Sequence, residues 1–207
     1  MHSLTKRVFF SGHVFTILRD VYEPAEDSFL FAENLMTHDS DSVIDVGTGC
    51  GILGVVAAAR AKRVLAVDIN SQAVRCAKEN AKLNRVDHKM LFIVGDLFTS
   101  IKVRKRFDLI VFNAPYLPSE EFEGDSWLGR AWAGGFSGRR IIDEFIHEAP
   151  KYLRPDGRIL LMQSTLSDVK ETLHSFEEKN LRADVIAKQD LPFFETIVLI
   201  KAESTEK

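Results

Sequence analysis

The sequence predicts an α/β fold in which a mostly parallel sheet carries helices on both faces. Short apolar runs bounded by Gly, Asp or Asn alternate with longer stretches in which apolar residues recur at helical spacing. This alternation is typical of βαβ units, whose strands run parallel. Near the end of the chain, two apolar runs are separated only by the turn at residues 189–194, which predicts an antiparallel hairpin at the sheet edge.

The elements are expected in a regular order along the chain. Strands at residues 8–10 and 14–18 form a small hairpin around Ser11-Gly12-His13, and a helix at 28–35 follows it. The strands of the main sheet are expected at residues 42–46, 64–68, 90–94, 107–112, 157–163, 183–186 and 196–200. The helices that accompany them are expected at residues 52–60, 71–84, 139–151 and 166–179. Ser71 follows a strand and opens an apolar-periodic run, so we interpret it as a helix N-cap.

The composition is that of an ordinary globular enzyme. The length predicts a single domain over residues 1–207, with a small N-terminal hairpin and helix extension at about residues 1–38. Because the first ten residues do not resemble a signal peptide and no segment is long and apolar enough to span a membrane, we expect a cytoplasmic protein. Cys50 and Cys76 offer no disulfide framework and the six histidines are scattered, so we expect no metal. A net charge of −3 does not suit a protein that grips a nucleic-acid backbone.

A glycine-rich loop follows the strand at 42–46. The segment 43–51 reads Val-Ile-Asp-Val-Gly-Thr-Gly-Cys-Gly, and glycines there let the backbone approach a ligand and turn into the next helix. The same loop fits a dinucleotide fingerprint, so by itself it does not separate NAD from S-adenosylmethionine. Three carboxylates at strand ends favour S-adenosylmethionine: Asp45 for the cationic methionine end, Asp68 for the ribose hydroxyls and Asp96 for the adenine amino group. Each alone would also suit a helix N-cap or a turn.

The tetrapeptide Asn113-Ala114-Pro115-Tyr116 directly follows the strand at 107–112. It would present a side-chain carbonyl, a rigid backbone carbonyl and a flat ring, which together fit a planar N–H₂ group. Taken alone, it could equally be an ordinary loop start, because Asn and Pro are common in turns. The loop at 115–138 exceeds the length of an idle connection, which predicts a lid or binding loop.

These motifs together resemble the S-adenosylmethionine-dependent class I methyltransferases, which have a Rossmann-like, seven-stranded sheet. More narrowly, the chain is similar to the HemK-type release-factor glutamine methyltransferases of the short archaeal and eukaryotic branch. The narrower resemblance rests on the segment 21–29, Val-Tyr-Glu-Pro-Ala-Glu-Asp-Ser-Phe, and on Ala-Trp-Ala-Gly-Gly at 131–135 with Gly138-Arg139. The usual tetrapeptide of that family is Asn-Pro-Pro-Tyr; here Ala114 supplies the same carbonyl, and Pro115 still restricts its backbone.

The resemblance implies S-adenosylmethionine as the cofactor and the side-chain amide of the glutamine in the Gly-Gly-Gln loop of a class-1 translation release factor as the acceptor. It also implies a small zinc-binding activator subunit as a partner. The expected cofactor-binding residues are Tyr22, Glu26, Ser28, Asp45, Gly47, Gly49, Gly51, Asp68, Ile69, Asp96, Leu97 and Asn113, and the expected catalytic residues are Asn113, Ala114, Pro115 and Tyr116.

Two other functions stay open at the level of sequence. The same turn suits an exocyclic amino group of adenine or guanine in RNA or DNA. Against this alternative stand the net charge and the acids of the long loop, Glu120, Glu121, Glu123 and Asp125, which would repel phosphates. A cofactor-binding module without catalysis is the second alternative, and the intact turn at Asn113 to Tyr116 argues against it.

Overall fold

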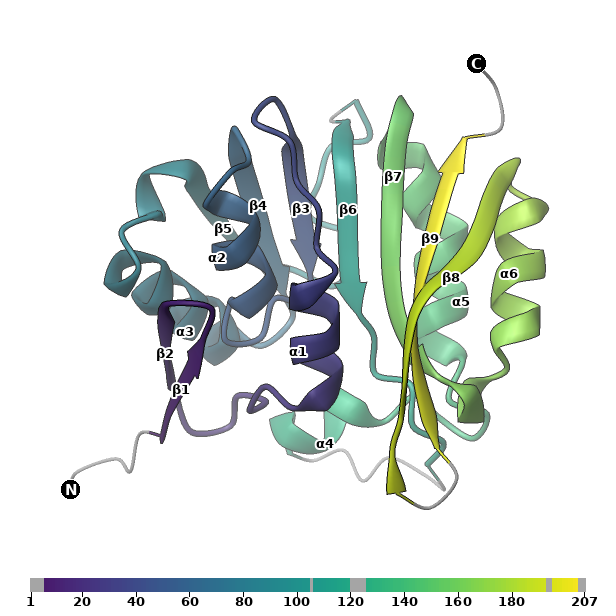
Figure 1. The fold of residues 1–207 in the computed structure, drawn as a ribbon, viewed down its shortest axis with the longest axis horizontal. Coiled ribbons are helices and arrows are strands. Elements are labelled where there is room, and N and C mark those ends of the chain that lie inside the picture. Colours follow the sequence, from purple (N-terminus) through teal and green to yellow (C-terminus); the bar gives the residue numbers. More distant parts are fainter. Residues whose placement is uncertain (1–5, 105, 120–125, 193–194, 205–207) are drawn as a thin grey trace. The chain divides into compact units, whose positions relative to one another are not determined.

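The computed structural model describes residues 6–104, 106–119, 126–192 and 195–204 (Figure 1). The predicted fold class is confirmed: the chain is α/β, with a seven-stranded, mostly parallel sheet and an antiparallel C-terminal hairpin. Backbone contacts divide the chain into two compact units, Met1–Lys102 and Val103–Lys207. The expectation of a single domain with an extension at 1–38 stays a prediction.

The first unit begins with a hairpin and continues with three parallel strands. Its elements are β1 (Lys6–Phe10), β2 (His13–Ile17), α1 (Glu26–Glu33), β3 (Ser42–Val46), α2 (Ile52–Ala58), β4 (Arg63–Asp68), α3 (Ser71–Leu83), the 3-10 turn η1 (Asp87–Lys89) and β5 (Met90–Val94). The strands pair in the order β5-β4-β3, all parallel. Every residue of β3 is buried, as expected for a parallel strand covered on both faces.

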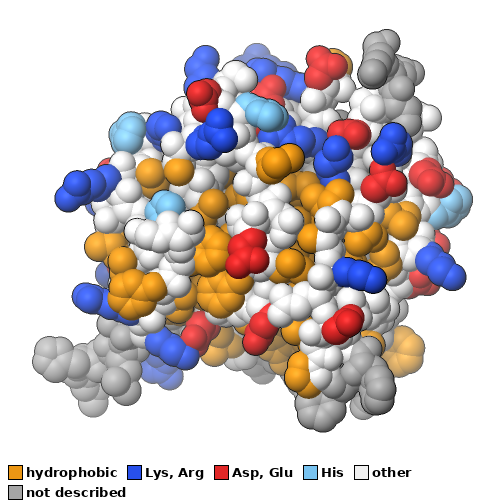
Figure 2. All heavy atoms as spheres, viewed as in Figure 1, with side chains coloured by type: hydrophobic (Ala, Val, Ile, Leu, Met, Phe, Trp, Pro, Cys, Tyr) orange, Lys and Arg blue, Asp and Glu red, His pale blue; other side chains and the backbone are white. Residues whose placement is uncertain are grey.

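The β1–β2 hairpin has a two-residue turn. Ser11 and Gly12 both have positive φ, 45° and 80°, as a type I′ turn requires. On the face drawn in Figure 2, hydrophobic side chains gather over this hairpin and α1. Phe10 stacks on Phe29 with ring centroids 5.6 Å apart, which joins the two elements.

The second unit carries the antiparallel part. Its elements are β6 (Phe107–Asn113), α4 (Trp127–Trp132), α5 (Arg140–Glu148), the 3-10 turn η2 (Ala149–Tyr152), β7 (Leu153–Ser164), the 3-10 turn η3 (Thr165–Ser167), α6 (Val169–Glu177), β8 (Leu181–Asp190) and β9 (Thr196–Ser204). The strands pair in the order β6-β7-β9-β8. β6 and β7 are parallel, and β9 is antiparallel to both β7 and β8. Therefore β9, the second strand of the C-terminal hairpin, lies inside the sheet, and β8, the first, lies at its edge.

Some boundaries differ from the prediction. The N-cap of α3 is Asn70 and not Ser71: Asn70 is extended, with φ −84° and ψ 112°, and its side chain accepts from the Gln72 N–H. The helix expected at 166–179 begins as the 3-10 turn η3, and α6 itself is capped by Asp168, whose side chain accepts from the Glu171 N–H. The helix expected at 139–151 ends at Glu148 and continues as η2, which contains Pro150. α4 was not predicted.

None of the helices in the described ranges is both long and apolar enough to cross a membrane.

Candidate functional site

The glycine-rich loop lies between β3 and α2. Gly47, Gly49 and Gly51 all have positive φ, of 63°, 56° and 85°. The Thr48 N–H donates to the Val67 carbonyl at 2.9 Å, and the Gly51 N–H donates to the Thr48 carbonyl at 2.8 Å. The first of these bonds fixes the loop to β4, and the second closes the turn into α2. The loop is therefore built by main-chain bonds, and it turns into α2 as its glycines predict.

Asp45 lies beneath this loop and is 1% exposed. Its Oδ2 accepts from Thr48 Oγ1 at 2.6 Å and from the Gly54 N–H at 2.9 Å. Its Oδ1 is buried, and no residue in the described part of the chain donates to it. Burial raises the pKa of this carboxyl to about 7, more than the hydrogen bonds from Thr48 and Gly54 lower it. A cationic donor, such as the ammonium group of a methionine, would both satisfy the oxygen and favour the ionised form.

Asp68 ends β4 and joins the loops that follow β3 and β5. Its Oδ2 accepts from the Gly49 N–H at 2.9 Å, and its Oδ1 accepts from the Asn70 N–H at 2.8 Å. Its carbonyl accepts from the Gly95 N–H at 3.0 Å. Burial raises its pKa above the usual range. Each carboxylate oxygen keeps a further lone pair, so the pair of ribose hydroxyls expected here fits an Asp that is already held in place.

The neighbouring residues suit a flat ring. Ile69 follows Asp68 and is 46% exposed, so its apolar side chain is accessible to a ligand. After β5, Asp96 is exposed, whereas Leu97 is buried and has a φ of 43°. The structure thus brings Asp45, Asp68 and the turn at 95–97 together at the carboxyl ends of three adjacent parallel strands, where open α/β sheets bind ligands.

The segment expected to contact the cofactor from the N-terminal side is held by Asp27. The Tyr22 hydroxyl donates to Asp27 Oδ1 and Oδ2 at 3.3 and 3.4 Å, and Ser28 donates to Oδ1 through its N–H and its hydroxyl. Asp27 is 6% exposed, whereas Glu26 beside it is exposed. Sequence reasoning missed Asp27. The available signal was an acid in the first turn of a helix, with the hydroxyl donors Tyr22 and Ser28 nearby in the sequence.

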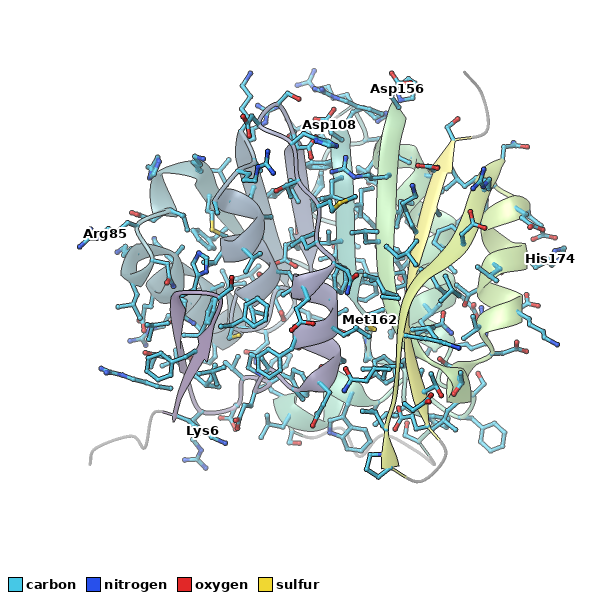
Figure 3. All side chains as sticks on the ribbon, in the orientation of Figure 1. Lys6, Arg85, Asp108, Asp156, Met162 and His174 are labelled. Carbon is cyan, nitrogen blue, oxygen red and sulfur yellow. The ribbon has the colours of Figure 1, made fainter. Side chains whose placement is uncertain are left out.

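The second unit holds the Asn113 turn. Asn113 ends β6 opposite Met162 of β7, which is labelled in Figure 3. The Ala114 N–H donates to the Met162 carbonyl at 3.4 Å. Proline has no N–H, so the usual Asn-Pro-Pro-Tyr could not make this bond. This bond to β7 therefore restores part of the backbone rigidity that a proline ring at position 114 would supply. Asn113 Oδ1 is shielded from solvent, and Tyr116 is 9% exposed.

The chain beyond Tyr116 is fixed to the segment that carries the narrower resemblance. The Leu117 N–H donates to the Trp132 carbonyl at 3.0 Å, and the Gly134 N–H donates back to the Leu117 carbonyl at 2.8 Å. The four acids at 120–125 lie outside the described residues. The two ends of the long loop are therefore paired with each other.

Arg139 has a structural role. Its guanidinium donates to the carbonyls of Ser167 and Asp168, to Thr172 Oγ1 and to Asp143 Oδ1, at 2.6 to 2.9 Å. Only 7% of Arg139 is exposed. These bonds join the start of α5 to η3 and α6. The part of the chain that the structure describes contains no cluster of three or more His, Cys, Asp or Glu side chains arranged to hold a metal ion.

A glycine-rich loop after one parallel strand, with carboxylates at the ends of the next two, is typical of a class I methyltransferase. Comparison with known proteins agrees. The sequence model of the ribosomal protein L11 methyltransferase (PrmA) family matches residues 28–115. The solved structure of E. cuniculi Mtq2, in complex with Trm112, superimposes with a TM-score of 0.69 at 26% identity, over 90% of this chain and 99% of that one.

Proteins of similar sequence show which family of methyltransferases the chain belongs to. A protein of Methanocaldococcus jannaschii that carries the name of a protein N5-glutamine methyltransferase is 42% identical over 182 residues, 87% of this chain and 90% of that protein. Methyltransferase HEMK2 of Mus musculus is 34% identical over 184 residues, 83% of this chain and 85% of that protein. The chain therefore belongs to the HemK-type family of protein N5-glutamine methyltransferases, and the resemblance found in its motifs is confirmed.

Proposed function

We propose that this protein transfers the methyl group of S-adenosylmethionine to the side-chain amide nitrogen of the glutamine in the Gly-Gly-Gln loop of a class-1 translation release factor. The observation that carries the proposal is the similarity to a protein named as an N5-glutamine methyltransferase, over 87% of this chain and 90% of that one. The E. cuniculi relative is described as acting in the methylation of eRF1, a translation termination factor. The turn at Asn113 also suits a planar amide as acceptor, because it offers two carbonyl oxygens for the amide N–H groups and a flat ring.

On the donor side, the first unit would hold the cofactor through residues with distinct tasks. S-adenosylmethionine, when bound, supplies an electrophilic methyl group on a positively charged sulfur. Asp45 would accept from the methionine ammonium, and Asp68 from the ribose hydroxyls. Ile69 and Leu97 would cover the adenine ring, and Asp96 would accept from its amino group. The remaining proposed contacts come from the N-terminal segment and the loop, namely Tyr22, Glu26, Ser28, Gly47, Gly49 and Gly51.

On the acceptor side, the amide nitrogen of glutamine is a poor nucleophile, because its lone pair is delocalised into the carbonyl. Asn113 Oδ1 and the Ala114 carbonyl would each accept one N–H, which orients the nitrogen and raises its electron density. Ala114 is fixed by its bond to Met162, and Pro115 restricts the next peptide. Tyr116 would pack against the flat amide. No side-chain general base is assigned; after the methyl group had moved from sulfur to nitrogen, the nitrogen would lose one proton to water.

Labelled S-adenosylmethionine tests this function with three acceptors: the release factor, its Gln→Ala variant and total RNA. We expect label on the first acceptor alone, and Asn113→Ala should abolish most of it. Label on RNA would support the alternative of an exocyclic amino group on a base. Label that persists on the Gln→Ala release factor would refute glutamine as the acceptor.

We further propose that the enzyme works with a small partner subunit, which docks on the outer edge of β5. The E. cuniculi relative was solved as a complex with Trm112. In the first unit β5 is the outermost strand, and its Leu91 and Val94 are 67% and 52% exposed. An open groove beside it is lined by Lys78, Lys82, Asp87, Met90, Leu91 and Phe92. An exposed apolar sheet edge of this kind pairs readily with a strand of another chain.

Co-purification with a small partner of the Trm112 type tests this docking. Leu91→Asp should prevent complex formation, and Leu128→Asp, an exposed apolar position outside β5, serves as the control. A complex that forms equally well with Leu91→Asp would show that the partner binds elsewhere.

A further inference from the structure

α3 packs against β2 (Figure 1). Two side-chain amides, those of Asn80 in the helix and of its C-cap Asn84, bond to β2 as a third strand would. Asn84 Oδ1 accepts from the Val14 N–H at 3.0 Å, and Asn84 Nδ2 donates to the Val14 carbonyl at 2.8 Å. Asn80 forms the same pair of bonds with Thr16, at 2.8 and 3.0 Å. Two residues of a strand advance about 7 Å and four residues of a helix about 6 Å, so asparagines at i and i+4 match alternate strand residues.

Asn80 makes two contacts that Asn84 lacks. Its Nδ2 donates weakly to Cys76 Sγ, at 3.6 Å, within α3. Its Nδ2 also donates to the Cys50 carbonyl, at 2.8 Å, in the glycine-rich loop. The corresponding second bond of Asn84 goes to the Asn80 carbonyl, within α3 itself. Asn80 is 1% exposed, so in the folded protein water does not reach its amide to replace these hydrogen bonds. A single buried amide therefore holds both the hairpin and the loop.

The chain that follows β2 is tied to the same site a second time. Asn70 Nδ2 donates to the Asp20 carbonyl at 2.8 Å, and the Asn70 N–H donates to Asp68 Oδ1 at 2.8 Å. The hairpin and the segment leading to Tyr22 are thus anchored to the loop at Cys50 and to the strand end at Asp68.

We propose that Asn80 is a positioning residue for cofactor binding: it couples the docking of the β1–β2 hairpin on α3 to the shape of the loop at residues 47–51. The inference rests on the proposed function, since it takes that loop as part of the S-adenosylmethionine site. Coupling between two binding events is reciprocal. The cofactor must therefore stabilise the docked hairpin as much as the docked hairpin favours the cofactor.

The experiment compares the parent protein with Asn80→Ala and with Asn84→Ala, which loses a hairpin contact but no loop contact. Calorimetry should show S-adenosylmethionine binding weakened by about tenfold in Asn80→Ala, the effect of one lost hydrogen bond. In Asn84→Ala the change should stay within about threefold. The same tenfold increase is expected in KM for the cofactor, with kcat at saturation changed less than about twofold.

Amide hydrogen exchange measures the coupling directly. In the parent, saturating S-adenosylmethionine should slow exchange at Val14 and Thr16. In Asn84→Ala it should still slow exchange at Thr16, whose bond to Asn80 remains. In Asn80→Ala it should leave Val14 unchanged, although the bond from Val14 to Asn84 is intact.

Equal loss of affinity in the two variants would overturn the proposal, because the contact with Cys50 would then have no special effect. Should Asn80→Ala fail to fold, the parent alone decides: cofactor that binds but leaves the exchange of Val14 and Thr16 unchanged would also overturn it. A parent protein that binds no S-adenosylmethionine would refute the proposed function itself.

Discussion

Gly51 offers a direct test of the contact between the glycine-rich loop and α3. It has a φ of 85°, and a Cβ at this position would lie 2.9 Å from both the Cα and the Cβ of Ala77. The left-handed conformation costs an alanine about 1 to 2 kcal/mol. A methyl group forced into a packed site costs about 1 to 3 kcal/mol more. Gly51→Ala should therefore lower the free energy of unfolding by about 2 to 5 kcal/mol.

Gly49→Ala is the matched control in the same loop. Its φ of 56° is also left-handed, but the nearest heavy atom to an added Cβ is the Gly47 carbonyl oxygen, at 4.0 Å. Only the backbone cost of about 1 to 2 kcal/mol is expected. Urea unfolding without cofactor measures both variants, provided that their m-values match that of the parent. Equal losses in the two variants would refute the close packing of the loop against α3.

Three further predictions concern the carboxylates and the acceptor turn. Asp68→Ala should weaken S-adenosylmethionine binding by roughly 2 to 3 kcal/mol by calorimetry, because charge-assisted hydrogen bonds are lost; unchanged affinity would contradict its role. Asn113→Ala should reduce turnover by about two orders of magnitude with little change in Tm, because it removes a group that orients the nucleophile; parental turnover would disprove this. Burial raises the pKa of Asp45 from 3.8 to about 7, so ionisation of this carboxyl opposes folding. The free energy of unfolding should therefore fall as the pH rises from about 4 to about 7, by roughly 4 kcal/mol at most. Denaturant unfolding of Asp45→Asn should show this part of the pH dependence removed, and an identical pH profile in parent and variant would rule it out.

Local sequence predicted the elements that carry their own signals. The short apolar runs and the helical patterns located every strand of the main sheet and the helices α2, α3, α5 and α6, although their ends moved by a few residues. The N-cap of α3 was misplaced because Asn70 and Ser71 are both good caps, and only the backbone conformation of Asn70 separates them. α4 was missed because the glycine-rich and aromatic segment around it has no helical periodicity.

The candidate site was predictable in its residues but not in the contacts that support them. Asp45, Asp68 and the glycine loop stand out because strand ends and glycines are visible in the sequence. Asn80 did not, since its partners Thr16 and Cys50 lie 64 and 30 residues away in the sequence. Asp27 was missed although its partners Tyr22 and Ser28 lie close to it in the sequence. The one signal for Asn80 was a polar residue within the buried stripe of α3, between Ala77 and Ala81.

The sequence by itself determined the fold class, the order of the strands in the chain and the family, because each is written in short-range patterns of apolar, glycine and carboxylate residues. It also predicts which residues face a cofactor and an amide. Only the tertiary structure decided which polar groups share a buried environment. Asp45 keeps one oxygen without a donor in the described chain, and Asn80 joins Thr16 to Cys50. Hydrogen bonding and desolvation depend on distances between segments far apart in the chain, and no local pattern specifies those distances.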